Sequence, residues 1–597
     1  MIDLDLCSAD DFLMLRRTLQ RELSAQPDLL PIRIAVLGGS TTTQLLTALE
    51  VLLLHSGFRP TFFEGEYGRF YEQAVHDSQA LIEFKPQIVY LHTSCYDVRN
   101  APPLDCTEAD LPRYVEAEMS RWTAIWDAID KQLACQVIQN NFEPPAAAPL
   151  GNMDAVSSGG FSRFLSLLNV RFAEEAARRP TLVLQNRHDI AARVGLRHWF
   201  DWDRYFSYKL LLTPDAQLEV ARSLASIVRA LLGRSRKVLV LDLDNTLWGG
   251  VIGDDGPDRI LIGRETAQAE AYTAFQEYCL ALRRRGVLLA VCSKNDESTA
   301  KSGFLHPDSV LKLADIACFK ANWDPKHQNL AAIAGELNLG PESFVFVDDN
   351  PAERAIVRAQ MPMVAVPEIG SEVTRFAAII DAGRYFEPAA LLKEDLERAS
   401  SYAANAQRHA EAAQFVDYGE YLDSLEMRAE IGPFRPVYLD RIAQLTNKTN
   451  QFNLTTRRFT LAEIESISKD PSWITLYAKL SDRFGDNGLI SVVAGRREGE
   501  TLHLELWLMS CRVLKRDMEL AMLDELAEAA RQLGIRRFIG YYRPTGKNSM
   551  VAQHYEMLGF NAIAAPPGLG DGSTAWELLL NSHTPRNTHI EVLKIVQ

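Results

Sequence analysis

The sequence predicts a multidomain α/β protein, and three observations point to this fold class. The chain has 597 residues, which at roughly 150 residues per domain corresponds to about three to five domains. Short runs rich in Val, Ile and Leu alternate with longer amphipathic stretches, as strands alternate with helices. Several of these runs are apolar throughout, which is typical of a parallel sheet buried on both faces.

The composition is that of a globular protein, with 47% hydrophobic and 24% charged residues. A net charge of −15 predicts that nucleic acid is not a partner. No apolar run approaches about 18 residues, and the acidic N-terminus lacks a basic region followed by an apolar one, so we expect neither a membrane span nor a signal peptide. The eight cysteines are scattered without a C-x-x-C pair, which favours a cytoplasmic location over a disulfide framework.

The first predicted domain covers residues 1–233. Its sheet begins at Ile32–Leu37, a strand that is followed by a glycine turn and a predicted helix from Thr41 to Leu54. A second strand, Gln87–Leu91, lies beyond an amphipathic stretch. Strand, turn, helix and strand in this order predict a parallel α/β sheet.

The glycine turn Gly38-Gly39-Ser40 resembles the first sequence block of SGNH-type hydrolases, in which the serine is the nucleophile. Such a serine needs a histidine base, which these enzymes carry in a late D-x-x-H motif. Here the corresponding position reads Asp203–Phe206, without histidine, and the only nearby substitutes are His188 and His198. We therefore expect Ser40 to cap the following helix or to bind a ligand, and we expect this SGNH/flavodoxin-like domain not to be a hydrolase.

The second predicted domain covers residues 234–374 and begins at the basic, glycine-led stretch Gly233–Lys237. Its strands are Val238–Leu241, Val287–Ser293 and Phe344–Asp349, separated by helical stretches. All three are apolar without alternation until their last residues, which predicts a second parallel sheet covered by helices on both faces.

Four carboxylates follow two of these strands. Asp242 and Asp244 come directly after the first strand, with their side chains on the same side of the extended chain, and Asp348 and Asp349 end the third. The carboxyl ends of parallel strands meet at one edge of the sheet, where ligands bind. Because clustered carboxylates do not all ionise easily without a cation, and because oxygen is the preferred ligand of Mg²⁺, the sequence predicts a magnesium site.

Two further residues complete a set of groups suited to phosphoryl transfer. Ser293 ends the middle strand and can donate a hydrogen bond to a phosphate oxygen, while Lys326 can neutralise the charge of phosphate and nucleophile. A carboxylate nucleophile, a second carboxylate as acid and base, a cation and a lysine are the parts that this reaction requires. The alternative interpretation is that acidic pairs at strand ends are helix caps or solvated turns.

The order of these groups resembles the haloacid dehalogenase (HAD) superfamily of phosphotransferases. The resemblance implies that Asp242 is the nucleophile that becomes an aspartyl-phosphate and that Asp244 is the general acid and base. The intervals Thr246–Ser293 and Ser293–Lys326 leave no room for an inserted cap domain, so the fold is expected to be capless and Rossmann-like. The residues implied in phosphate binding are Thr246, Ser293, Asn295 and Lys326, and those implied in metal binding are Asp242, Asp244, Asp348 and Asp349.

Three longer stretches, Asp242–Gly256, Ser293–Asp296 and Phe346–Pro351, resemble the FkbH-like group of capless HAD proteins. The resemblance implies that the protein takes glycerate from 1,3-bisphosphoglycerate, releases phosphate and loads the glyceryl unit onto an acyl carrier protein. A capless site is open, which suits a large or protein-borne substrate.

Residues 375–430 are charged and helical in pattern, and we expect a connector there. Residues 431–597 form the third predicted domain, with an α+β pattern and one antiparallel sheet. Its predicted elements are strands Trp473–Leu480, Leu489–Ala494, Thr501–Met509 and Arg537–Tyr542, with a helix Met518–Leu533 before the last of them.

This third domain has three turn-flanked polar clusters: Asn447–Arg458, Ser481–Gly488 and Ser510–Glu519. They resemble the GNAT acyltransferase fold. GNAT enzymes cradle the pyrophosphate of coenzyme A in a glycine-rich loop. The matching loop here begins at Arg512 and carries Lys515 and Asp517 where glycines would stand, so a carrier-borne phosphopantetheine arm, which lacks the pyrophosphate, fits better than coenzyme A. The residues implied in acyl or carrier binding are Asn450, Asn453, Arg483, Arg512, Asn548 and Tyr555.

Cys511 lies between Ser510 and Arg512, and a neighbouring arginine can lower the pKa of a thiol and make it nucleophilic. The resulting hypothesis is a Cys511 thioester; the alternative is a small buried hydrophobic side chain. Cys292 is a second candidate. Because successive side chains of a strand point to opposite faces, we expect it to face away from the side that Ser293 faces. His554 could act as a base, or it is a surface or core residue.

Three functions therefore remain open from the sequence. The first is phosphate release coupled to glyceryl loading of a carrier protein. The second is a plain Mg²⁺-dependent phosphatase whose outer domains serve for docking. The third is an N- or O-acyltransferase that the HAD-like domain supports.

Overall fold

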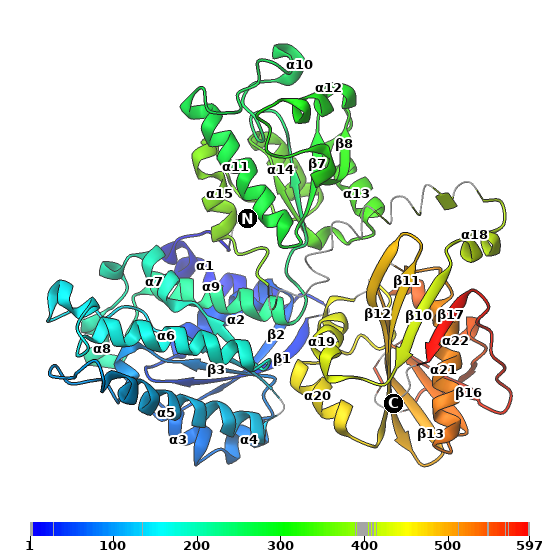
Figure 1. The fold of residues 1–597 in the computed structure, drawn as a ribbon, viewed down its shortest axis with the longest axis horizontal. Coiled ribbons are helices and arrows are strands. Elements are labelled where there is room, and N and C mark those ends of the chain that lie inside the picture. Colours follow the sequence, from blue (N-terminus) through cyan, green and yellow to red (C-terminus); the bar gives the residue numbers. More distant parts are fainter. Residues whose placement is uncertain are drawn as a thin grey trace. The chain divides into compact units, whose positions relative to one another are not determined.

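A computed structural model describes residues 4–594 except 28, 134, 389, 391–403, 405–407, 409–410, 413–414, 450, 511–512, 546–547, 567–568 and 571. It confirms the predicted multidomain α/β class, with two parallel sheets and one mixed sheet (Figure 1). The chain divides into two compact units. One consists of the chain up to Leu232 together with Arg458–Asp470, and the other of Gly233–Arg457 with Pro471–Gln597. Within the described part of the chain, every helix is too short or too polar to cross a membrane.

The N-terminal sheet has five parallel strands in the order β2-β1-β3-β4-β5. β3 is buried throughout, and β1 is buried from Ile34 to its end. The strands are β1 Leu30–Gly38, β2 Phe58–Glu64, β3 Ile88–His92, β4 Gln136–Asn140 and β5 Leu182–Gln185. The helices are α1 Ala9–Ser24, α2 Thr43–His55, α3 Phe70–Val75, α4 Gln79–Phe84, α5 Leu111–Gln132, α6 Phe161–Arg178, α7 Arg187–Val194, α8 Trp202–Tyr208 and α9 Pro214–Leu231.

Of the two roles expected for Ser40, that of a cap for the helix after β1 is wrong. Helix α2 begins at Thr43, and its N-cap residue is Thr42. Thr41 explains the later start, because its backbone N–H donates to Lys209 O at 2.9 Å and its hydroxyl to Tyr208 O at 3.0 Å. These two bonds hold the residues before α2 in a loop against the end of α8, which leaves Ser40 three residues away from the helix.

The central domain has four parallel strands in the order β8-β7-β6-β9. Successive residues of β6 enter two separate apolar clusters, which confirms that the sheet is buried on both faces. Helices α11 and α15 cover one face, and α13 and α14 cover the other (Figure 1). The strands are β6 Val238–Leu241, β7 Leu288–Ser293, β8 Ile316–Ala321 and β9 Phe344–Val347, and the helices are α10 Ile252–Asp255, α11 Ala267–Arg284, α12 Glu297–Ser302, α13 Lys326–Leu337, α14 Pro351–Gln360 and α15 Val373–Ala382.

No cap domain interrupts the described chain between these strands. Only α10 and α11 lie between β6 and β7, and only α12, two short 3₁₀ turns and β8 lie between β7 and α13. The predicted boundary at residue 374 falls inside α15, whose Phe376 and Ile380 pack in the central core. Within the predicted connector, residues 389, 391–403, 405–407, 409–410 and 413–414 lie outside the described residues; one of its described pieces is α18, Tyr418–Ser424.

The C-terminal sheet has eight strands in the order β15-β16-β14-β13-β12-β11-β10-β17. The predicted single antiparallel sheet is wrong, because the pairs β13–β14 and β10–β17 are parallel. Helix α21 connects β13 to β14, and such a crossover returns the chain in the same direction. The strands are β10 Met427–Gly432, β11 Trp473–Asp482, β12 Gly485–Glu498, β13 Thr501–Met509, β14 Arg537–Tyr542, β15 Asn561–Ile563, β16 Thr574–Leu579 and β17 Ile590–Lys594; the helices are α19 Leu439–Lys448, α21 Met518–Gln532 and α22 His554–Met557. Helix α20, Leu461–Lys469, belongs to the unit that contains the N-terminal sheet.

Candidate active site

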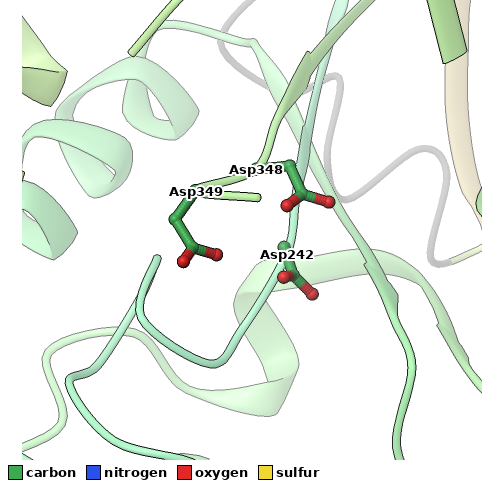
Figure 2. A group of neighbouring side chains, drawn as sticks. All are labelled: Asp242, Asp348 and Asp349. Carbon is green, nitrogen blue, oxygen red and sulfur yellow. The ribbon is translucent and has the colours of Figure 1, made fainter. Parts of the chain in front are cut away.

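Three carboxylates meet at the carboxyl edge of the central sheet. Asp242 follows β6, and Asp348 and Asp349 follow β9, which lies beside β6. Their carboxylate groups face one another (Figure 2), and one oxygen from each lies within 4.8 Å of the others. Asp242 is 7% exposed and Asp348 is fully buried, while Asp349 is half-buried. The juxtaposition follows from the parallel register, since Asp242 N–H donates to Val347 O at 2.9 Å.

Lys326 pairs with two of these carboxylates. It is the first residue of α13, and its Nζ lies 2.9 Å from Asp242 Oδ1 and 2.6 Å from Asp348 Oδ2. Burial alone would lower the pKa of Lys326, but the charges of Asp242 and Asp348 more than reverse this effect and raise it. Lys326 therefore stays charged and neutralises one of the three carboxylates.

The remaining charge fits a divalent cation. Burial and the repulsion from Asp242 raise the pKa of Asp348 to about 6, and the same two causes raise the pKa of Asp349. Three carboxylates and one ammonium group leave two negative charges uncompensated at pH 7. Mg²⁺ is a hard, doubly charged ion that prefers oxygen ligands, so the three aspartates suit it.

Asp244 is held by donors from three directions. Its Oδ1 accepts from Trp248 Nε1 at 2.9 Å and from the Ile252 N–H at 3.0 Å, and its Oδ2 accepts from Asn295 Nδ2 at 3.2 Å. Burial raises the pKa of Asp244, although these donors oppose the shift. Asn245, with a φ of 54°, turns the chain sharply behind Asp244.

The other predicted phosphate-binding residues lie at the same edge. Thr246 is fully buried, and its hydroxyl accepts from the Asp349 N–H at 3.2 Å. Ser293 ends β7 and is 1% exposed, and Asn295 follows it at 6% exposure. The sequence analysis missed Trp248 and Ile252 as partners of Asp244, although both belong to the stretch that it singled out.

A comparison with solved structures matches this chain to the N-terminal part of the protein BF1531 from Bacteroides fragilis, which contains a phosphatase domain and was crystallised in complex with Mg. The two sequences are 30% identical, the TM-score is 0.58, and the match covers 63% of this chain and 99% of the other. The chain belongs to the family of this phosphatase-domain protein. No family model matches the chain, and no curated protein does either.

Two smaller structures also match. A ribosomal-protein alanine N-acetyltransferase from Escherichia coli is 14% identical with a TM-score of 0.21, covering 27% of this chain and 98% of the other. The GNAT domain of PAT from S. lividans is 17% identical with a TM-score of 0.21, covering 25% of this chain and 89% of the other.

Cys292 is enclosed between the sheet and α13. It is fully buried in the apolar cluster on the α13 side of the sheet, while Val291 belongs to the cluster on the opposite side. Its thiol lies 3.7 Å from Lys326 O, and burial raises its pKa far above the ordinary value. A thiol that stays protonated in a closed apolar cluster is a packing residue, not a nucleophile.

In the N-terminal domain, the candidate serine is buried, whereas both candidate histidine bases are exposed. Ser40 is 7% exposed, whereas His188 and His198 are both exposed. Two charged residues are buried after the ends of β4 and β5. Arg187 and Glu143, both fully buried, form an ion pair at 3.1 Å, which the sequence analysis missed.

Asn548 has a structural role in the C-terminal domain. Its Nδ2 donates to Asn453 O at 3.0 Å and to Arg543 O at 2.9 Å, and its Oδ1 accepts from the Thr545 N–H at 2.7 Å. Asn548 is fully buried and Asn453 is 1% exposed. Since both hydrogens of the amide are in use, Asn548 joins two loops of the fold and has no donor left for an acyl group.

Tyr555 and His554 are core residues. Tyr555 is 1% exposed, and the ring of His554 packs edge-on against Trp507 and Phe452 at 4.9 Å each. Burial raises the pKa of Tyr555 far above its ordinary value and lowers the pKa of His554 to about 3. The neutral His554 ring is therefore enclosed among aromatic side chains and is not placed to act as a base.

Of the other predicted acyl-site residues, Arg483 forms an ion pair with Glu411 and stacks over the Phe484 ring at 4.9 Å. Asn450, Cys511 and Arg512 lie outside the described residues. Lys515 and Asp517 have φ angles of 62° and 58°, in the left-handed region that favours glycine. The loop before α21 thus has a glycine-like backbone at both positions where glycines were expected.

Proposed function

We propose that the central domain is a Mg²⁺-dependent phosphatase in which Asp242 accepts the phosphoryl group. The observation that carries the proposal is the position of Asp242, between the ammonium group of Lys326 and the two carboxylates that follow β9. The family relationship to a phosphatase domain that binds Mg supports it.

The chemistry assigned to each residue follows from its contacts. The free oxygen of Asp242 attacks phosphorus, the bond from phosphorus to the leaving oxygen breaks, and Asp244 protonates that oxygen. Lys326 and the N–H and hydroxyl groups at the ends of β6 and β7 stabilise the phosphoryl oxygens. Water then attacks phosphorus of the aspartyl-phosphate while Asp244 takes up its proton, and the bond from phosphorus to the Asp242 oxygen breaks, which releases phosphate and restores the carboxylate. Bound Mg²⁺ supplies the charge that lets the anionic phosphate approach anionic Asp242.

For the substrate we propose 1,3-bisphosphoglycerate, whose glyceryl unit is loaded onto an acyl carrier protein. A thiol attacks the acyl carbon and displaces the 1-phosphate, which leaves a thioester, and Asp242 takes the phosphoryl group from the 3-phosphate ester, whose alkoxide leaving group Asp244 protonates. The resemblance of three stretches of the central domain to FkbH-like proteins supports this choice. The lack of an inserted cap between β6 and α13 also fits a carrier-borne substrate, because a bulky partner needs an uncovered site.

The acyl-transfer step would take place at the loop between β13 and α21. Lys515 and Asp517 have a left-handed backbone there, which costs a residue other than glycine of order 1 kcal/mol. Such a conformation persists only where the surroundings require it, and this supports a role of the loop in binding an extended ligand arm. The buried state of Asn548 and Tyr555 leaves this loop, with Cys511, as the proposed acyl site.

Incubation of the full chain with Mg²⁺, 1,3-bisphosphoglycerate and a candidate holo-carrier protein tests both the phosphatase activity and the loading of the carrier. Phosphate release is followed continuously, and intact mass spectrometry of enzyme and carrier detects a glyceryl adduct. Loading that depends on Mg²⁺ and on the carrier supports the full proposal. Phosphate release without an adduct on either protein leaves a plain phosphatase. Tight binding of acetyl-coenzyme A with acylation of an amine or sugar favours the N- or O-acyltransferase instead.

A further inference from the structure

The stretch between Asp244 and α10 folds back onto Asp244 itself. Trp248 pairs with Asp244 in an isolated parallel bridge, and Gly249 pairs with Leu261 in an antiparallel one. The Asn245 side chain accepts from the Gly250 N–H at 3.1 Å and closes the turn. The residues just after the proposed acid and base therefore form a small ordered flap, residues 245–255.

Within this flap, the Trp248 side chain is tightly packed. It is fully buried, and its ring packs edge-on against Phe304 at 5.6 Å. A Cβ atom on Gly303 would lie 2.7 Å from Trp248 Cη2, so the chain approaches the indole more closely than any other residue type allows. An indole in such a site cannot change rotamer, and its N–H has a fixed direction.

That N–H points at one particular oxygen. Trp248 Nε1 and the Ile252 N–H both donate to Asp244 Oδ1, at 2.9 Å and 3.0 Å, so this oxygen has two donors. Oδ2 accepts only from Asn295 among the described residues, at 3.2 Å. Two donors fill the in-plane acceptor sites of Oδ1, whereas Oδ2 keeps one. The two oxygens of Asp244 are therefore not equivalent.

We propose that Trp248 is a positioning residue for the phosphoryl-transfer step: its buried indole N–H, together with the Ile252 N–H, occupies Oδ1 of Asp244 and holds Oδ2 as the oxygen that gives its proton to the leaving group. This inference rests on the proposed function of Asp244. The proton leaves Asp244 Oδ2 as the bond from phosphorus to the leaving oxygen breaks, and the new bond forms at Asp242.

Dependence on the leaving group separates this role from a structural one. An alkoxide leaving group needs the proton, whereas 4-nitrophenolate leaves as a stable anion. The measured quantity is kcat/KM in Mg²⁺ for ethyl phosphate and for 4-nitrophenyl phosphate, because it reports the steps up to departure of the leaving group. For Trp248→Phe we expect a loss at least tenfold larger with ethyl phosphate than with 4-nitrophenyl phosphate.

Phe304→Leu is the matched control, since it loosens the same packing but keeps the indole N–H. Its losses should be equal for both substrates. Equal losses for Trp248→Phe would overturn the proposal and make Trp248 a packing residue. If Trp248→Phe does not fold, 3-benzothienylalanine at position 248 keeps the shape of the indole and replaces N–H by sulfur, with the same expectation. A wild-type protein that hydrolyses neither substrate in Mg²⁺ overturns the proposed phosphatase and this inference together.

Discussion

Lys326 Nζ lies 2.9 Å from Asp242 Oδ1, and the two side chains are 3% and 10% exposed. The pair joins the first residue of a helix to the residue after a strand that lies far from it in the sequence. Because Asp348 shares the same ammonium group, removal of Lys326 would leave two carboxylates without a counter-charge in a mostly buried site.

We therefore expect Lys326→Met to destabilise the metal-free protein by about 3–5 kcal/mol, the usual cost of removing one partner of a buried pair. Added Mg²⁺ should restore part of this loss, since it neutralises the same carboxylates. Urea denaturation in EDTA and in Mg²⁺ measures both effects. Lys320→Met is the control in the same domain: Lys320 pairs with Glu336 at a more exposed site, where a loss below about 1 kcal/mol is expected. Equal losses of unfolding free energy for the two variants would contradict the role of Lys326 as the counter-charge that stabilises the two carboxylates.

Asp242→Asn should abolish phosphate release while leaving the fold intact. The amide is nearly isosteric with the carboxylate but is a poor nucleophile, so the rate should fall by about a thousandfold or more. The measurement is steady-state phosphate release, with circular dichroism to verify folding. Asp258→Asn, at an exposed position of the same domain, should behave as wild type. A rate for Asp242→Asn within about tenfold of the wild type would rule out an aspartyl-phosphate.

The affinity for Mg²⁺ should fall as the pH is lowered through 6. The pKa of Asp348 is about 6 in the metal-free protein, above its ordinary value, so a proton competes with the metal below that pH. The dissociation constant should then rise by about fivefold between pH 6 and 5, and by close to tenfold per pH unit below that, as measured by calorimetry. Asp348→Asn should remove this dependence, and an affinity that does not change with pH would contradict the assignment.

The same shift has a consequence for stability. A carboxyl group whose pKa is raised by folding binds its proton more tightly in the folded state than in the unfolded state. The stability that this proton contributes is fully present below the ordinary pKa of aspartate and is lost as the pH rises to about 6. In EDTA, the midpoint of thermal unfolding should therefore decrease between pH 4 and 6, and Mg²⁺ should compensate for this loss at pH 7.

Ser40→Ala should leave the activity of the protein unchanged, and the wild type should not hydrolyse esters. Ser40 is buried, whereas His188 and His198 are exposed, so neither histidine is expected to activate it. Turnover of 4-nitrophenyl acetate measures this. Ester hydrolysis that disappears in Ser40→Ala would show a histidine base that the sequence and the structure do not indicate.

Cys511→Ser should stop loading of the carrier protein while phosphate release continues. The proposed thioester needs a thiolate, and the hydroxyl group of serine is a far weaker nucleophile at neutral pH. Intact mass of the wild type should show an acyl adduct that hydroxylamine removes. Cys292→Ala is the control, because its buried thiol should not matter for loading. Loading by Cys511→Ser at the wild-type rate would make Cys511 a structural residue and would favour direct transfer to the carrier.

Local pattern predicted several elements of the C-terminal domain closely. The ranges Thr501–Met509 and Arg537–Tyr542 match β13 and β14, because each is an apolar run bounded by turn residues. The direction of their pairing was not predictable in the same way. It depends on α21, which connects them along the chain as a crossover, and the composition of a strand contains no information on the direction of its neighbour.

The sequence alone determined which residues can carry out the proposed chemistry: Asp242, Asp348 and Asp349 each follow an apolar run, and parallel strands bring such ends to one edge. Only the tertiary structure decided which side chains are free to act. Lys326 pairs with Asp242, Trp248 occupies one oxygen of Asp244, and Asn548 and Tyr555 are enclosed in the fold. Burial and hydrogen-bond saturation arise from contacts between residues that are distant along the chain, and no local pattern encodes them.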